Sequence, residues 1–124
     1  MKFIQSKPFI FGAKEKIEHV GEGITRQLLG YDNNIMMAKV VFKQGAISYV
    51  HKHEHVQVSY IISGKFEVTI GDKVHVLQAG DSFYVESDIF HQCICIEEGE
   101  LIDVFNPARE DFCTDLDFDG DFDD

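Results

Sequence analysis

Short turn signals recur along most of the chain, and this rhythm limits the possible folds more than any other feature. The segments between the turns are rich in Val, Ile, Phe and Tyr, which favour extended backbone. No stretch longer than a few turns keeps the apolar spacing of an amphipathic helix free of glycine. The sequence therefore predicts an all-β sandwich or barrel with few, short helices. The turn signals are Asn33-Asn34, Gln44-Gly45, Ser63-Gly64, Gly71-Asp72, Ala79-Gly80 and Glu98-Gly99.

The alternation of side chains predicts one hairpin in detail. An alternating apolar run ends at Ile70, and a second run begins at Val74. A two-residue turn over residues 71–72 would mix the apolar and polar faces of these runs. A three-residue loop over residues 71–73 pairs Ile70 with Val74 and keeps one face apolar. We therefore expect the longer loop, with His75 on the outward face.

Charge, the N-terminus and the cysteines together indicate a cytoplasmic protein. The formal net charge of −11 opposes contact with phosphate backbones and anionic membranes, so we expect neither nucleic acid nor membrane partners. The first residues lack the apolar segment of a secretion signal, and no segment is long enough to span a bilayer. The three cysteines lack the spacing of a disulfide framework, which agrees with a reducing compartment.

Length and composition predict one folded domain followed by a tail. A chain of 124 residues fits a single domain. The composition changes near the C-terminus, where aspartates are interspersed with a few apolar residues. We expect a single domain over residues 1–112 and an acidic, disordered tail over residues 113–124.

Four polar residues in the middle of the chain have the chemistry of metal ligands. His51, His53 and Gln57 share one parity, so on extended backbone their side chains project to the same side. Two imidazoles two residues apart on a strand can bind one metal ion. His91 follows downstream and could complete the set. The pattern favours a metal site over an isolated structural histidine.

Other histidines and two cysteines are alternative candidates for metal ligands. His55 has the same parity and stays open as a rival ligand. Cys93 and Cys95 could bind a metal as a pair, but no second pair accompanies them, so we interpret them as small buried residues. His19 and His75 are expected at the surface.

A carboxylate stands in the centre of the apolar strand predicted over residues 101–105. This residue, Asp103, shares a face with apolar neighbours, and an ionisable group there is unfavourable unless it is paired or functional. Arg109 follows closely and is suited to bidentate capture of a carboxylate. Two interpretations stay open, a structural Asp103–Arg109 ion pair and a catalytic group.

The histidine spacing resembles the first motif of the cupins. That motif is Gly45-x5-His51-x-His53-x3-Gln57-x6-Gly64, in which Gln57 stands where Glu is usual. A looser second motif keeps its leading glycine and final histidine, while Glu86 and Asp88 replace the usual Pro and Gly: Gly80-x5-Glu86-x-Asp88-x2-His91. The resemblance implies an all-β double-stranded β-helix, the cupin jelly-roll barrel.

The run Asp103-x-Phe105-x-Pro107-x-Arg109, together with Gln57, resembles the KdgF family of pectin-degradation cupins. That family linearises 4,5-unsaturated uronate monosaccharides from pectin or alginate to 5-keto-4-deoxyuronate and is often dimeric. The resemblance implies a homodimer that takes this small sugar as substrate. It also implies one divalent transition-metal ion, such as Zn, Ni, Co, Fe or Mn, bound by His51, His53, Gln57 and His91.

The same resemblance places Asp103, Phe105 and Arg109 around the sugar. Asp103 would transfer protons, Arg109 would hold the substrate carboxylate, and Phe105 would pack against the ring. Two other classes stay open. One is a different metal cupin enzyme, such as a dioxygenase or a keto-sugar isomerase, and the other is a non-catalytic cupin that senses a sugar or a metal.

Overall fold

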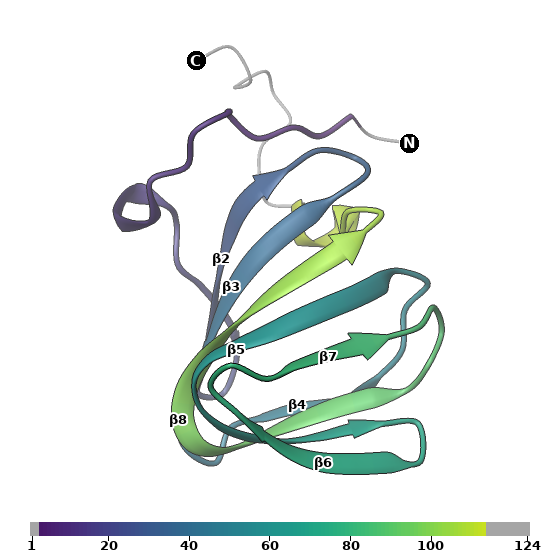
Figure 1. Cartoon of the computed structure of the whole chain (residues 1–124). Coiled ribbons are helices and arrows are strands. Elements are labelled where there is room, and N and C mark those ends of the chain that lie inside the picture. Colours follow the sequence, from purple (N-terminus) through teal and green to yellow (C-terminus); the bar gives the residue numbers. More distant parts are fainter. Residues whose placement is uncertain (1–2, 114–124) are drawn as a thin grey trace.

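The computed structural model describes residues 3–113, which form eight β-strands and two short 3₁₀ helices (Figure 1). The prediction of an all-β fold with few, short helices is confirmed, and no helix in the described part could cross a membrane. The strands are β1 (Glu18–Gly21), β2 (Ile24–Tyr31), β3 (Met36–Phe42), β4 (Ile47–His51), β5 (Val56–Ile70), β6 (Lys73–Gln78), β7 (Ser82–Val85) and β8 (His91–Asn106). The helices are η1 (Gly12–Lys14) and η2 (Glu110–Cys113).

All eight strands belong to one antiparallel sheet that curls over itself to form a barrel. The strand order is β1-β2-β3-β8-β5-β6, with β4 added on β8 and β7 added on β5. The long strands β5 and β8 run through both halves of the barrel, and Figure 1 shows both of them bending sharply. One half of β8 pairs with β3 and the other half pairs with β4.

Two of the predicted turns are wrong, because these segments are bends within the long strands. Ser63-Gly64 and Glu98-Gly99 lie inside β5 and β8 rather than between strands. The β5–β8 register shifts on both sides of Ser63, and a Cβ added to Gly99 would stand 2.1 Å from the Ser63 carbonyl oxygen. These glycines therefore permit two bent strands to approach closely. In the sequence, glycines that serve this purpose look the same as glycines that mark a turn.

The predicted hairpin loop is also wrong by one residue. Ile70 pairs with Lys73, so the turn is the two-residue Gly71-Asp72, and φ of Gly71 is 59°. A glycine with positive φ at the first turn position suits the tight hairpin turns that match strand twist. Val74 is 53% exposed as a result, and His75 is exposed as expected but lies on the same side as Val68.

Buried residues of the described part of the chain form two apolar clusters. The first cluster includes Ile61, Phe66, Val85 and Leu101, with Cys93 and Cys95 buried as predicted. The second contains Ile4, Leu28, Met36, Ala38, Phe105, Ala108 and Cys113. Cys113, the first residue of the predicted tail, is thus buried, and residues 114–124 lie outside the described residues, so the tail stays a prediction.

Candidate metal centre

Three histidines from three different segments converge at one end of the barrel. His51 ends β4, His91 begins β8 as its pairing partner, and His53 lies in the connection that follows β4. One ligand nitrogen from each of them lies within 4.8 Å of the other two. The β4–β8 pairing therefore brings together histidines that are far apart in the sequence and positions them to bind a metal ion.

Each of these imidazoles is oriented by a backbone carbonyl. A carbonyl oxygen can only accept, so each Nδ1 carries the proton and each Nε2 keeps a lone pair for a metal. The Nε2 of His91 is buried and has no hydrogen-bond partner within the described part of the chain. The Nδ1 contacts are His51 to Tyr49 O at 2.7 Å, His53 to His55 O at 2.9 Å and His91 to Ile89 O at 2.9 Å.

Burial keeps two of these histidines neutral. It lowers the pKa of His91 to about 4, and it lowers the pKa of His53 below its ordinary value of 6.5. Neutral imidazole is the form that binds a metal. At neutral pH, His53 and His91 can therefore bind a cation without first losing a proton.

Gln57 fits as a fourth ligand because of the way its amide is held. Its Nε2 donates to Ser59 Oγ at 2.9 Å and to Asp103 Oδ1 at 3.1 Å. This orientation leaves Oε1 3.1 Å from Nε2 of His53. With Nδ1 of His53 protonated, these two atoms are both acceptors, and a cation shared between them would relieve their repulsion. Three imidazoles and an amide oxygen suit a divalent transition-metal ion.

His55 lies outside this cluster. The group of three ligand nitrogens found among the described residues excludes it, and its ring centroid is 5.5 Å from that of His53. Its carbonyl oxygen instead accepts a hydrogen bond from the Nδ1–H group of His53. His55 thus orients a neighbouring imidazole through its backbone. His19 is exposed, as expected.

Asp103 lies on the inner face of β8, next to Gln57. Its carboxylate accepts hydrogen bonds from Gln57 Nε2 and from the hydroxyl of Ser59. Burial raises the pKa of Asp103 to about 6, although hydrogen bonds from Ser59 and Gln57 oppose that shift. A carboxyl group with this pKa can both take and return a proton near neutral pH.

The alternative of a structural Asp103–Arg109 ion pair is wrong. Arg109 donates from Nε and Nη2 to the two carboxylate oxygens of Asp111, at 3.0 and 2.8 Å. Its guanidinium carbon lies 4.2 Å from the centre of the Phe112 ring and 5.4 Å from that of Phe105. The partner of Arg109 is instead Asp111, which lies two residues further along the chain in η2.

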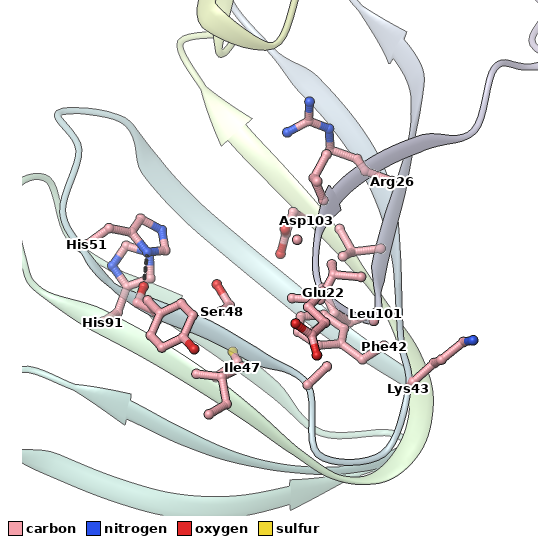
Figure 2. Close-up of a pocket in the computed structure, with 18 of the residues that line it drawn as sticks. Glu22, Arg26, Phe42, Lys43, Ile47, Ser48, His51, His91, Leu101 and Asp103 are labelled. Atoms are coloured by element: carbon pink, nitrogen blue, oxygen red, sulfur yellow. Dashed lines mark hydrogen bonds between the residues drawn. The ribbon is translucent and has the colours of Figure 1, made fainter.

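A cavity of about 760 Å³ joins these groups. His53 does not line it, although its imidazole belongs to the histidine cluster. Figure 2 shows Asp103 below Arg26, with His51 and His91 together at the left. The six other predicted site residues all line the cavity: His51, Gln57, His91, Asp103, Phe105 and Arg109.

Two residues of this site, Ser59 and Arg26, are not among those predicted from the sequence. Ser59 shares the parity of Gln57 and pairs with Asp103, but the pairing could be recognised only once the β5–β8 register was known. Arg26 lines the cavity from β2, in a row between buried Ile24 and Leu28. A charged residue in such a row was a usable signal.

This barrel, with its histidine cluster at one end, has the architecture of a cupin. The family profile described as "Cupin domain" matches residues 38–105, which is more than half of the chain. The chain therefore belongs to the cupin family, and the relatives below place it with the KdgF proteins among them.

The pectin degradation protein KdgF of Dickeya dadantii (strain 3937) is 39% identical over 97 residues, or 77% of this chain and 88% of that protein. The structure of KdgF from Halomonas sp. is 29% identical with a TM-score of 0.82, covering 86% and 99% of the two chains. An RmlC-like cupin from Shewanella frigidimarina NCIMB 400 is 47% identical with a TM-score of 0.85, covering 87% and 97%.

Proposed function

We propose that this chain linearises 4,5-unsaturated uronate monosaccharides from pectin or alginate to 5-keto-4-deoxyuronate. The observation that carries the proposal is the amide of Gln57, whose oxygen faces His53 while its nitrogen donates to Asp103. This arrangement places a carboxylate that can transfer protons next to a histidine cluster that can bind a metal ion. Similarity to a protein named for pectin degradation supports the choice of substrate.

The substrate explains why both groups are needed. Its carboxylate is conjugated to the C4=C5 double bond, and its ring oxygen is an enol ether joined to a hemiacetal carbon. Opening of the ring leaves an enolate at C5, which must then be protonated at C4. A divalent ion on His51, His53, Gln57 and His91 would supply Lewis-acid stabilisation of the developing negative charge, worth several kcal/mol in comparable sites.

Asp103 would move the proton in this reaction. Its carboxylate takes the proton of the C1 hydroxyl, the C1 carbonyl forms, and the bond from C1 to the ring oxygen breaks with its electron pair on that oxygen. Asp103 then returns a proton to C4, which yields the C5 ketone. A positioned acid–base group of this kind typically contributes roughly 100- to 10,000-fold in rate.

Phe105 and Arg109 would complete the surroundings of the sugar. The Phe105 side chain is 2% exposed and lines the cavity, so it can pack against the ring and exclude water. Arg109 lines the same cavity and adds positive charge beside the carboxylate of the substrate.

The proposal is tested with metal-loaded protein and freshly prepared unsaturated galacturonate. Loss of the conjugated double bond, followed by ultraviolet absorbance, should proceed faster than the spontaneous reaction. Absence of any acceleration with full metal content would refute the proposed activity. Oxygen consumption by iron-loaded protein would instead indicate a dioxygenase, turnover of a saturated sugar phosphate an isomerase, and sugar binding without turnover a sensor.

We also propose that two copies pair through the outer face of the sheet. Val58 on β5 pairs with Val104 on β8 and with Tyr84 on β7, so apolar side chains continue across three strands. In a chain with a net charge of −11, an apolar face of this kind suits burial against a second copy. We define this outer patch by its exposed members, Met37, Val58, Tyr60, Ile62 and Tyr84.

A further inference from the structure

Arg26 is a charged residue on the inner face of the barrel. It stands on β2 between Ile24 and Leu28, which are 6% and 7% exposed, and it pairs with Val40, which is 7% exposed. A guanidinium in an apolar row loses hydration, and this is unfavourable unless its donors find partners. The side chain of Arg26 is only 15% exposed.

Two contacts hold this guanidinium in place but occupy only one of its nitrogens. Nε donates to Glu18 Oε1 at 3.2 Å, and the guanidinium carbon lies 3.7 Å from the centre of the Phe112 ring. The two Nη groups make no hydrogen bond within residues 3–113. Arg26 is thus anchored by Glu18 and Phe112 while its terminal N–H donors remain available.

Arg109 is in the opposite situation. Nε and Nη2 are both committed to Asp111, which leaves Nη1 as its one nitrogen without a hydrogen bond in the described part of the chain. Bidentate capture of a carboxylate requires two parallel N–H donors from one guanidinium. Arg109 would have to break its contact with Asp111 to provide them, whereas Arg26 would break nothing.

Arg26 also has the right position in the cavity. It lines the same space as Asp103, His51 and His91. In Figure 2 it lies above Asp103, on the side away from the two histidines. A sugar whose acidic end contacts Arg26 would therefore extend past Asp103 towards the histidine cluster.

We propose that Arg26, through its two Nη groups, is the residue that binds the carboxylate of the sugar and selects uronates over neutral sugars. The inference rests on the proposed function, because it assigns the acidic group of that substrate to one end of the cavity. Arg109 then contributes charge and supports Phe112, the ring that both guanidinium groups contact.

The test compares binding of D-galacturonate and D-galactose to metal-loaded full-length protein by isothermal titration calorimetry. These sugars differ in the carboxylate and lack the reactive double bond, so binding is measured without turnover. The wild type should bind the acid at least about 10-fold more tightly than the neutral sugar. Arg26→Gln should remove this preference and leave the affinity for galactose unchanged.

Glu18→Gln is the matched control, since it removes the ion pair of Arg26 but keeps the guanidinium on Phe112. It should retain most of the preference for the acid. If Arg26→Gln does not fold, Arg26→Lys is used instead, because it keeps the charge but loses the paired N–H donors of the guanidinium. It should reduce the preference for the acid at least about 3-fold. A wild type without preference, or a folded Arg26 variant that keeps it at equal metal content, would overturn the inference.

This experiment separates the inference from the proposed activity. If the protein prefers galacturonate through Arg26 but does not accelerate loss of the conjugated double bond, the carboxylate site is supported and the proposed reaction is refuted. If the protein accelerates the reaction but Arg26→Gln keeps the preference for the acid, the proposed reaction is supported and the role of Arg26 is refuted.

Discussion

His91 is the histidine on which the metal centre depends most directly. Its Nε2 is buried without a partner, and its ring centroid lies 4.1 Å from that of His51. His91→Ala should abolish metal binding and leave a folded barrel, because the apolar clusters stabilise the fold independently of the ion. Elemental analysis and circular dichroism check this. His75→Ala, at an exposed position outside the cluster, should keep full occupancy, and a metal-replete His91→Ala would contradict the assignment.

For Asp103, shape and proton transfer can be separated by one substitution. Asp103→Asn keeps the volume of the side chain and removes the acid–base group, so turnover of the unsaturated uronate should fall at least about 100-fold. Metal content should hold, since no proposed ligand is changed. An Asp103→Asn protein that linearises the uronate at the wild-type rate would refute the proton-transfer role.

The same substitution has a pH-dependent effect on stability. Burial raises the pKa of Asp103 from 3.8 to about 6, so the folded state binds this proton more tightly than the unfolded chain does. Its contribution to the free energy of unfolding is therefore complete below pH 3.8 and is lost as the pH rises through about 6. Between pH 4 and pH 7 in metal-free protein, the melting temperature of wild type should fall relative to that of Asp103→Asn. Parallel curves would contradict this.

Asp88 occupies a backbone conformation that glycine adopts more easily. Its φ is 62°, and its N–H donates to the carbonyl of His53 at 2.8 Å. The residue that replaces the usual glycine of the second cupin motif thus keeps a glycine-like conformation. Asp88→Ala should lower the free energy of unfolding by about 1 kcal/mol relative to Asp88→Gly. Urea denaturation of the two variants measures the difference, and equal stabilities would argue against strain at this position.

At the scale of elements, the close pairing of β5 with β8 determines the shape of the barrel and the position of the site residues on these strands. A Cβ on Gly99 would meet the Ser63 backbone at 2.1 Å, so Gly99→Ala should destabilise the protein by at least about 2 kcal/mol. Gly30→Ala in β2 is the control, because nothing lies within 4 Å of its added Cβ. Urea midpoints that shift equally for both variants would show that the close approach is not limiting.

At the scale of the whole molecule, the outer patch predicts self-association. Tyr60 is 50% exposed within that patch, and Tyr60→Glu should convert a dimer into a monomer in sedimentation equilibrium, because it buries a charge in the interface. Val74→Glu changes an equally exposed residue outside the patch and should leave the dimer intact. A monomeric wild type, or a dimeric Tyr60→Glu variant, would contradict the assembly.

Local features of the sequence were sufficient for the fold class and for most of the proposed site. Alternation and turn residues act over a few positions, so they indicated strands without knowledge of their partners. Parity likewise grouped His51, His53 and Gln57, and the structure brings the first two to His91 and the third next to His53. The buried carboxylate in an apolar strand identified Asp103 for the same reason, since it contradicts a local pattern.

Only the tertiary structure decided the features that depend on which strands meet. Turn geometry set the hairpin register at Gly71-Asp72 against the apolar alternation, and the close approach of β5 and β8 gave Gly64 and Gly99 their place inside strands. The Ser59–Asp103 contact likewise follows from the pairing of β5 with β8, two segments that are distant in the sequence. Such contacts join residues far apart in the chain, and no local periodicity records them.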